Sequence, residues 1–464
     1  MKFDIAIIGS GPGGYVAAIR ASQLGKKVAI IEKESLGGIC LNWGCIPTKA
    51  LLKSAQVFEY INHAEDYGIE VGKSKVDFDK IISRSRSVAD GMSKGVQFLM
   101  KKNKIEVIPG FGKLKKPGQI EVDDNGKKQI IEASNIIIAT GGRSKELPNL
   151  PIDGKKIIGY REAMSLSKQP KRMVVVGAGA IGAEFAYFYS AIGTEVTIVE
   201  FLEQGLLPRE DADISKELAR HFKKKGIKVM ANTSVEMVEP KGSSLQVKVK
   251  ERKSGKEEMI ECDVVLSAAG ISTNLEGIGL EELGIKSDKG LITVDPYYRT
   301  NIAGIYAIGD VVMGPALAHV ASAEGIICVE KICGDNPQPL DYQNIPSCTY
   351  CHPEVASVGY TEASAREAGF EIKVGKFPYS ASGKASASGH KEGFVKVIYD
   401  AKYGEWLGAH MIGENVTEMI AEVVAARKLE TTGHEIIKTV HPHPTMSEAI
   451  MEASAAAYDE VIHI

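Results

Sequence analysis

The chain has little cysteine and no long apolar run. Its 464 residues include seven cysteines, an odd count at a density too low for a secreted protein built around disulfides. No apolar run approaches the roughly 18 residues that a membrane-spanning helix needs. The N-terminal stretch MKFDIAIIGSG reads directly as a strand entering a turn, so no signal peptide is expected. We therefore expect a cytoplasmic protein, in a compartment where any disulfide is more often catalytic than structural.

The chain also lacks an excess of either charge. Its 56 Lys and Arg residues nearly balance 59 Asp and Glu residues, which leaves a formal net charge of -3. Nucleic-acid or anionic-membrane binding is not indicated, because both favour a basic bias. The composition, 44% hydrophobic and 25% charged, is that of an ordinary globular protein. A chain of this length should divide into about two to four domains.

Residues 3–33 and residues 172–201 repeat one pattern. Each copy has an apolar β-branched run, a glycine turn, an Ala-rich helical stretch and a second apolar run that ends at or next to Glu. A glycine, Gly25 or Gly193, stops each helical stretch. The pattern predicts two copies of a βαβ unit. Two widely separated copies predict two nucleotide-binding domains.

Each copy contains a Gly-x-Gly-x-x-Gly turn with an acid about 20 residues further on. One glycine permits the tight turn, one lets a pyrophosphate approach the backbone, and one lets the helix pack on the strand. The helix N-terminus offers unpaired N–H groups to the phosphates. The residues are Gly9, Gly11, Gly14 and Glu32 in the first turn, and Gly177, Gly179, Gly182 and Glu200 in the second.

The two acids indicate which nucleotides bind. A carboxylate at Glu200 can accept hydrogen bonds from the ribose hydroxyls and would repel a 2′-phosphate, so the second turn should prefer NAD over NADP. The first turn, with Glu32, must hold a different dinucleotide if electrons are to be passed on. FAD is the simplest choice.

The rest of the chain completes an α/β fold with a separate C-terminal part. The residue pattern predicts helices with polar faces over residues 51–105 and short strands over residues 106–133. After residue 340, antiparallel strands are expected at 393–400 and 405–413, followed by a helix. We predict two Rossmann-like dinucleotide-binding domains and a C-terminal α+β domain. The expected boundaries are 1–148 and 271–343 for the first nucleotide domain, 149–270 for the second, and 344–464 for the α+β domain.

Cys40 and Cys45 lie in the segment GGICLNWGCIPTKALL. Five residues of regular helix rise about 7.5 Å, whereas a disulfide needs Cα atoms within about 6.8 Å. A bridge therefore requires Cys40 to lie in a turn before the helix, which the nearby glycines and Pro47 would allow. Cys45 would then sit at a helix N-terminus, which favours the thiolate. Lys49, four residues on, would add positive charge on the same face.

The other cysteines give weaker signals. Cys328 and Cys333 have the same spacing, but they lie in an unbroken helical pattern ending at Gly334, so we interpret them as free thiols. CTYCH at 348–352 matches a c-type haem attachment pattern, yet such haems belong to exported proteins. A redox or metal role for Cys348 and Cys351 is the minor alternative to an ordinary structural role. Cys262 is interpreted as structural. We expect no metal site.

Taken together, the two turns and the segment between them resemble the flavin disulfide reductases, the class I pyridine nucleotide-disulfide oxidoreductases. The resemblance runs from about residue 3 to the end of the chain. TNIAGIYAIGD at 300–310 is similar to the family's second flavin motif, and LAHVASAEG at 317–325 follows it. HPHPTMSEAIMEA at 441–453 is similar to the motif that supplies the family's catalytic base. The run AAGISTN at 268–274 departs from the family, because it lacks an Arg pair often seen there.

The resemblance assigns roles to individual residues. It implies a redox disulfide between Cys40 and Cys45, a base at His443 oriented by Glu448, and Lys49 beside the flavin, paired with Glu184. Asp310 would lie at the ribityl chain. The further cofactor contacts that it implies are Gly112, Thr140, Gly141, Ile181, Gly270, Leu317, Ala318 and His319.

Within that family, the motifs most resemble enzymes that oxidise protein-bound dihydrolipoamide with NAD⁺. This implies one FAD per subunit, and a homodimer joined through the α+β domain, in which each base serves the partner's cysteines. It also implies lipoyl domains of 2-oxo acid dehydrogenase complexes, or the glycine cleavage H protein, as partners. Two alternatives stay open. One is another flavin disulfide reductase of glutathione, mycothiol or mercuric type, and the other is a non-catalytic NAD- or FAD-binding subunit.

Overall fold

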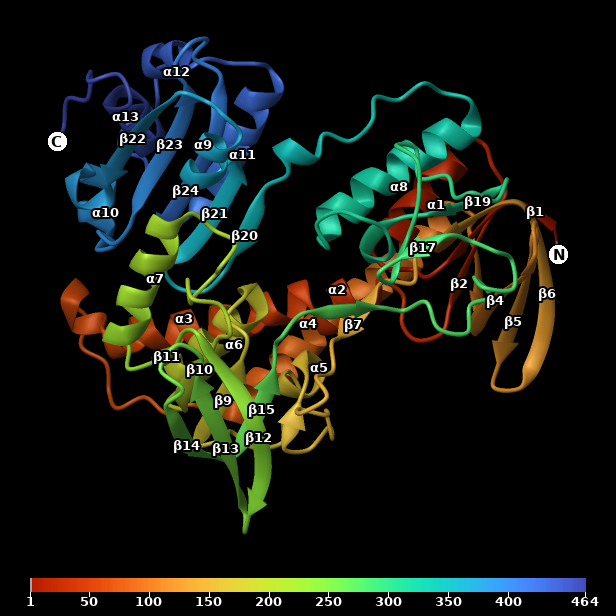
Figure 1. Cartoon of the computed structure of the whole chain (residues 1–464), viewed down its shortest axis with the longest axis horizontal. Helices are drawn as coiled ribbons and strands as arrows, with labels where there is room; N and C mark the ends of the chain where they lie inside the picture. The colour runs from red at the N-terminus through yellow and green to blue at the C-terminus, as the bar shows by residue number, and fades with distance from the viewer. Residues whose placement is uncertain (1) are drawn as a thin grey trace. The chain divides into compact units, whose positions relative to one another are not determined.

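The computed structural model describes residues 2–464, which divide into two compact units (Figure 1). Unit 1 comprises the chain up to Leu51, Asp79–Lys145 and Gly270–Leu340. Unit 2 comprises Leu52–Phe78, Glu146–Ala269 and Asp341–Ile464. Among the described residues, no helix is both long and apolar enough to cross a membrane.

Unit 1 is built on a seven-stranded sheet with the order β3-β2-β1-β6-β5-β4, in which β19 pairs with the C-terminal residues of β6, beyond those that pair with β5. The strands β1, β2, β3, β6 and β19 run parallel, while β4 and β5 form an antiparallel extension. Ile7 pairs with Ile30 on one side and with Ile137 on the other. The strands are β1 (Lys2–Ile8), β2 (Val28–Glu32), β3 (Glu106–Pro109), β4 (Phe111–Lys116), β5 (Gln119–Asp124), β6 (Lys127–Ile138) and β19 (Ile305–Ala307).

Helices α1 to α4 lie between the first three strands in the chain, and α8 follows β19. Helices α1 and α8 pack so closely that a Cβ on Gly325 would lie 2.8 Å from the Gly13 carbonyl oxygen. Helix α3 begins in unit 1 and ends in unit 2. The remaining elements are α1 (Pro12–Gln23), α2 (Gly38–Trp43), α3 (Cys45–Asn62), α4 (Phe78–Lys102), α8 (Ala318–Cys333), and the short strands β7 (Gly142–Ser144), β16 (Ile271–Thr273), β17 (Ser287–Asp288) and β18 (Leu291–Ile292).

Unit 2 contains a second parallel sheet with the order β11-β10-β9-β15-β8. A three-stranded antiparallel sheet, β12-β13-β14, leads into β15. The elements are β8 (Ile157–Ile158), α5 (Tyr160–Ala163), β9 (Arg172–Val176), α6 (Ala180–Ala191), β10 (Glu195–Val199), α7 (Ala212–Lys224), β11 (Lys228–Met230), β12 (Thr233–Lys241), β13 (Ser244–Glu251), β14 (Glu257–Cys262) and β15 (Val264–Ser267).

The C-terminal part of unit 2 is an antiparallel sheet with the order β20-β21-β24-β23-β22. Helix α13 packs on β22 and β23, and α11 packs on β21 and β24. The elements are β20 (Ser347–Thr349), β21 (Glu354–Gly359), α9 (Glu362–Glu367), β22 (Ile372–Pro378), α10 (Gly383–Ser388), β23 (Phe394–Asp400), β24 (Trp406–Gly413), α11 (Val416–Lys428), α12 (Gly433–Lys438) and α13 (Glu448–Ala456).

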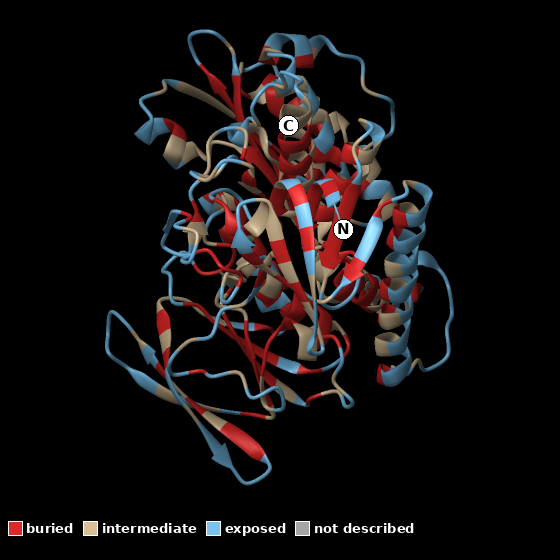
Figure 2. Ribbon diagram, turned by 90° about the vertical axis from the view of Figure 1, so that its right-hand side faces the viewer, coloured by how far each residue is buried: buried red, intermediate tan, exposed pale blue. Residues whose placement is uncertain are grey.

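The parallel strands of unit 1 are buried on both faces. Ile5, Ile7 and Ile30 contribute to one core cluster, whereas Ile8 and Ile31 contribute to another. Alternate residues of a strand point to opposite faces, so a continuous apolar run marks a strand that is covered on both sides. Figure 2 shows the buried residues concentrated in the strands and the exposed residues on loops and outer helix faces.

The predicted fold class is confirmed, since both βαβ repeats form as expected and antiparallel strands precede α11. The helical pattern around Cys328 is also confirmed, because α8 is continuous and stops at Gly334, where φ is 99°. The four domain boundaries stay predictions.

Candidate active site

In the first turn, the three glycines face different surroundings. Gly9 has φ of 103°, and a Cβ there would lie 2.2 Å from the Ala139 carbonyl oxygen. A Cβ on Gly14 would lie 2.0 Å from the carbonyl oxygen of Gly9, so only glycine lets α1 approach the strand. A Cβ on Gly11 would meet nothing within 4 Å. Gly11 therefore leaves an open approach to the N-terminus of α1, where a pyrophosphate is stabilised by unpaired N–H groups.

The second turn, in unit 2, repeats this geometry. Gly177 has φ of 102°, and its Cβ would lie 2.5 Å from the Ala268 carbonyl oxygen. A Cβ on Gly182 would lie 2.0 Å from the Gly177 carbonyl oxygen, as a Cβ on Gly14 would from that of Gly9, and a Cβ on Gly179 would meet nothing within 4 Å. Both turns therefore have the backbone shape that a dinucleotide requires.

The acid that follows each turn is held in the same way. One carboxylate oxygen of Glu32 accepts the Ser10 backbone N–H at 3.0 Å, and the other accepts the Glu34 N–H at 2.8 Å. Glu200 accepts the Ala178 N–H at 2.7 Å and the Leu202 N–H at 2.8 Å. Each acid is thereby fixed at the end of its strand, beside the glycine turn. Lone pairs on each carboxylate are left over for ribose hydroxyls.

Other buried polar groups of unit 1 fit a flavin nucleotide. The Thr140 hydroxyl is buried without a hydrogen-bond partner, which is rare unless a ligand completes the site. Burial raises the pKa of Asp310, and a Cβ on Gly142 would lie 3.3 Å from its carboxylate. Leu317 caps the N-terminus of α8, the helix in which Ala318 is the first residue. These features suit a polar chain with hydroxyl and phosphate groups.

The remaining predicted contacts occupy varied positions. Gly141 and Gly270 have positive φ, 67° and 110°, with open space at the Cβ position. Gly112 is packed in β4, where an added Cβ would lie 3.2 Å from the Ile8 side chain. Lys49 lies in α3, His319 in α8, and Ile181 and Glu184 in α6. The Glu184 carboxylate accepts the Tyr350 N–H at 2.9 Å. Its pairing with Lys49, and all cofactor contacts, stay predictions.

Cys40 and Cys45 lie on two helices separated at Gly44. The expectation that Cys40 lies in a turn is wrong, because it lies within the short helix α2. Cys45 begins α3, as predicted, and the break comes at Gly44, where φ is -143° and ψ is -116°. The broken helix removes the distance limit that a regular helix would impose. The Cys40 thiol contacts Cys45, and this hydrogen bond, together with burial, raises the pKa of Cys40.

Helix α4 holds the segment that carries the two cysteines. The Arg86 guanidinium lies 4.2 Å from the centre of the Trp43 ring and donates to the Asn42 carbonyl oxygen. The Ser85 hydroxyl donates to the Pro47 carbonyl oxygen at 2.8 Å. Sequence reasoning missed Ser85 and Arg86, because no local pattern links them to residues about 40 positions earlier. They act as a rigid support for the thiols.

His443 and Glu448 form a hydrogen-bonded pair in unit 2. His443 Nδ1 lies 2.8 Å from Glu448 Oε1, and the Thr445 N–H donates to Glu448 Oε2, also at 2.8 Å. Burial raises the pKa of Glu448, but the hydrogen bonds from Thr445 and His443 outweigh it and leave the pKa below its usual value. The His443 side chain is 76% exposed, so its Nε2 is accessible. A carboxylate on Nδ1 makes Nε2 the proton acceptor.

A second histidine–glutamate pair lies beside the first. His441 Nε2 lies 2.8 Å from Glu422 Oε1, and its Nδ1 meets the Thr439 carbonyl oxygen at 3.0 Å. Only 5% of the His441 side chain is exposed. Both nitrogens of His441 are therefore engaged, which marks His441 as structural and leaves His443 as the candidate base. Sequence reasoning did not foresee the role of Glu422.

The other five cysteines are placed where reactivity is low. Burial raises the pKa of Cys262 to about 12, and it raises that of the fully buried Cys328 as well. Cys333 is half-buried, and burial raises its pKa. The Cys348 thiol lies 4.0 Å from the Thr417 carbonyl oxygen, and the buried Cys351 thiol 3.3 Å from that of Pro353.

Comparison with known proteins places this geometry in a family. Residues 3–325 match the model described as pyridine nucleotide-disulphide oxidoreductase, and residues 345–454 match the dimerisation domain of that family. The dimerisation domain supports a homodimer.

Individual proteins match over the full length of the chain. Dihydrolipoyl dehydrogenase from Rhizobium etli is 49% identical, covering 100% of this chain and 99% of the relative. Dihydrolipoyl dehydrogenase from Zymomonas mobilis is 50% identical, covering 99% of each. The crystal structure of LpdA from Mycobacterium tuberculosis superposes with a TM-score of 0.90 at 28% identity, covering 97% of this chain and 99% of that one. The glycine turns, the cysteine pair and these matches agree, and the chain belongs to the pyridine nucleotide-disulphide oxidoreductase family.

Proposed function

We propose that this enzyme is a dihydrolipoyl dehydrogenase, which oxidises protein-bound dihydrolipoamide to lipoamide and reduces NAD⁺. The observation that carries the proposal is the contact between the Cys40 and Cys45 sulfurs at the break between α2 and α3. Two facing thiols are what reversible dithiol–disulfide exchange requires. The names of the full-length relatives support the choice of substrate.

His443 acts as the base in the first step. Its Nε2 takes a proton from one thiol of dihydrolipoamide, and Glu448 stabilises the resulting imidazolium through the 2.8 Å hydrogen bond to Nδ1. The substrate thiolate then attacks the Cys40 sulfur of the Cys40–Cys45 disulfide, and Cys45 leaves as the thiolate.

The second thiol of the substrate completes the exchange. Its sulfur attacks the substrate sulfur that is bonded to Cys40, which closes the lipoamide ring and releases the Cys40 thiol. Two electrons have then moved from the substrate dithiol to Cys40 and Cys45. Cys45, at the N-terminus of α3, is stabilised as the thiolate by the helix dipole. When bound, FAD would supply the two-electron chemistry that passes these electrons on to NAD⁺ and allows Cys40 and Cys45 to form the disulfide again.

The chain's own residues hold and select the cofactors. The first glycine turn, Glu32, the buried Thr140 hydroxyl and the half-buried Asp310 would bind FAD in unit 1. The second turn and Glu200 would bind NAD in unit 2. A carboxylate at Glu200 opposes a 2′-phosphate, which disfavours the NADP-dependent reductases of the family. No feature of the described residues favours a non-catalytic binding subunit, which needs neither the dithiol nor the His443–Glu448 pair.

The partners follow from the same chemistry. The proposed homodimer brings His443 of one subunit to the cysteines of the other. Lipoyl domains of a 2-oxo acid dehydrogenase complex, or the glycine cleavage H protein, would deliver the dithiol on a lipoyl arm. The residues assigned to catalysis are Cys40, Cys45, His443 and Glu448.

An anaerobic titration with dihydrolipoamide tests the proposal. The purified protein should be yellow and should develop a long-wavelength thiolate–flavin band when the dithiol is added. Cys45→Ser should abolish this band, and His443→Gln should slow its formation about 10²–10⁴-fold with the bound flavin unchanged. Cys333→Ser, at a half-buried thiol on α8, is the matched control and should behave as wild type. Flavin reduction at the wild-type rate in Cys45→Ser would refute the assignment.

A further inference from the structure

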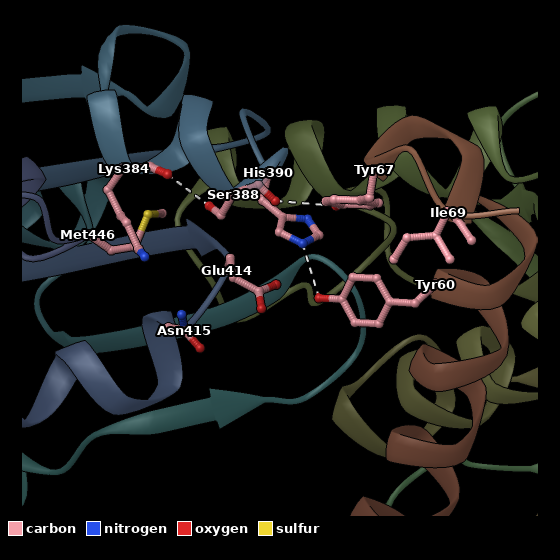
Figure 3. Close-up of a pocket in the computed structure, with 10 residues that line it drawn as sticks. Tyr60, Tyr67, Ile69, Lys384, Ser388, His390, Glu414, Asn415 and Met446 are labelled. Carbon is pink, nitrogen blue, oxygen red and sulfur yellow. Dashed lines mark hydrogen bonds between the residues drawn. The ribbon is translucent and has the colours of Figure 1, made fainter.

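A pocket in unit 2 contains ionisable groups that the proposed reaction does not use. It has a volume of about 430 Å³ and is lined by Tyr60 and Tyr67 from the segment 52–78, and by His390, Glu414 and Met446 from the C-terminal part (Figure 3). In Figure 3 the His390 ring projects between Glu414 and the two tyrosines. The Tyr60 hydroxyl lies 3.0 Å from His390 Nε2, and Tyr67 donates to the Ser388 carbonyl oxygen at 3.2 Å.

His352, from the loop between β20 and β21, contacts two of the residues that line this pocket, His390 and Glu414. Its ring centre lies 5.6 Å from that of His390, with the two rings nearly perpendicular. His352 Nδ1 lies 3.8 Å from Glu414 Oε2. One ligand atom from each of His352, His390 and Glu414 lies within 4.8 Å of the other two. All three side chains are half-buried, so the site is partly shielded but reachable from solvent.

Two imidazoles and one carboxylate form a donor set suited to a borderline divalent metal. Zinc binds imidazole nitrogen and carboxylate oxygen at about 2.0–2.2 Å, so tetrahedral ligand atoms lie about 3.3 Å apart. The three atoms here lie within 4.8 Å of one another, so no pair has to approach by more than about 1.5 Å to reach that distance. Magnesium is a poor match, since it prefers oxygen ligands in octahedral geometry.

We propose that His352, His390 and Glu414 bind Zn²⁺ at this site, with water in the fourth position. The Tyr60 hydroxyl, through its hydrogen bond to His390, acts as an outer partner that orients the ring. The metal would link the loop before β21, the turn after α10 and the end of β24. The three ligands come from three separate segments, so a bound metal would cross-link these segments at one end of the C-terminal sheet.

Zinc binding to the oxidised, FAD-containing protein tests the proposal. The Cys40–Cys45 disulfide keeps those sulfurs from competing for metal. After removal of metals with a chelator, we expect one Zn²⁺ per subunit by competition with a zinc indicator dye. His390→Asn and Glu414→Gln should each weaken binding by at least about 10–100-fold, as expected when a metal site loses a ligand or its support. Tyr60→Phe should give a smaller loss, because it removes no ligand.

The matched control is His63→Asn, at a histidine just after α3 whose side chain is 71% exposed. It should bind zinc as wild type does. X-ray absorption of the zinc-loaded protein should show two imidazoles and no sulfur ligand. Retention of full affinity in both His390→Asn and Glu414→Gln, or sulfur in the zinc shell, would overturn the proposal. Circular dichroism of the variants separates loss of a ligand from loss of fold.

Discussion

At the scale of single residues, the His443–Glu448 pair is the feature with the most direct chemical meaning. The low pKa of Glu448 keeps it ionised at neutral pH, because hydrogen bonds from Thr445 and His443 outweigh the effect of burial. A group whose folded pKa is depressed contributes stability above its unfolded pKa and loses it as pH falls through the folded value. The pair should therefore stay intact at neutral pH and weaken only in acid.

Glu448→Gln should lower kcat by about 10²–10⁴-fold while leaving flavin content unchanged. The amide cannot stabilise the imidazolium that forms when His443 accepts a proton. Steady-state kinetics with dihydrolipoamide, across neutral pH, measures the effect.

Glu422→Gln is the control for that experiment. It disrupts the neighbouring His441–Glu422 pair, which has the same 2.8 Å geometry but no accessible ring nitrogen. Its kcat should stay within a few-fold of wild type. An equal loss in both variants would mean that Glu448 only supports the loop.

Glu200→Gln should reduce the preference for NAD⁺ over NADP⁺ by at least about tenfold, because it removes a charge that repels the 2′-phosphate. The amide oxygen can still accept from the Ala178 N–H, so the turn should hold its shape. The ratio of kcat/KM for the two nucleotides is the measurement. Glu203→Gln, at a side chain 71% exposed, should leave the ratio unchanged.

At the scale of elements, the break between α2 and α3 shows how far a sequence can be interpreted. Glycine and proline around the cysteines predicted an interrupted helix, and Cys45 does begin α3. The position of Cys40 could not be predicted, because a six-residue helix such as α2 is stabilised by its packing rather than by its own sequence. The contacts that Ser85 and Arg86 make near the cysteines could not be predicted from the sequence either, because they depend on long-range packing of α4.

Another element-level feature is an ion cluster in unit 2 that is centred on a buried lysine. Lys396 on β23, 4% exposed, contacts Asp211 at 2.9 Å, Asp213 at 3.2 Å and Glu362 at 2.9 Å. Asp211 caps α7, whose first turn includes Asp213, and Glu362 begins α9. The pKa of Asp211 falls despite its burial, because Lys396 and backbone N–H groups bind the charged form.

Lys396→Met should destabilise the protein by about 3–5 kcal/mol, because the Asp211 carboxylate, 3% exposed, would be left buried without its cation. Urea unfolding at neutral pH, monitored by circular dichroism, measures this. The penalty should shrink below about pH 4, the usual range of an Asp carboxyl, as the acids become protonated in the variant.

Lys376→Met is the matched control, since Lys376 contacts the same Asp213 at 3.4 Å but is 44% exposed. Its loss should cost no more than about 1 kcal/mol. Equal costs for the two lysine variants would show that burial does not strengthen the cluster.

At the scale of the whole molecule, the sequence predicted the family and fold class because those depend on local, repeated patterns. The two glycine turns and their acids are short motifs with fixed spacing, and they form nearly identical structures. The candidate zinc site was not predicted, and no metal was expected, because His352, His390 and Glu414 come together only through the antiparallel sheet and its loops. Motifs within one segment can be interpreted directly, whereas sites assembled from distant segments need the fold.

A mixed dimer tests whether the active site is shared between subunits. Cys45→Ser and His443→Gln should each be nearly inactive alone. Random exchange of subunits makes half of the dimers mixed. In a mixed dimer, one of the two sites combines an intact cysteine pair with an intact His443, so about a quarter of wild-type activity should return. Activity is assayed after reversible dissociation and mixing. If each site used its own subunit's His443, no activity would return.

The different burial of the seven thiols has a practical consequence. Cys262, Cys328 and Cys351 are buried, whereas Cys40, Cys45, Cys333 and Cys348 are half-buried. An alkylating reagent added to the native protein reacts with accessible thiolates and spares the buried thiols. Reduction of the proposed Cys40–Cys45 disulfide would therefore add two alkylation sites, visible as a fixed increase in intact mass. Quenching cells with such a reagent would record the fraction of enzyme caught in each oxidation state during metabolism.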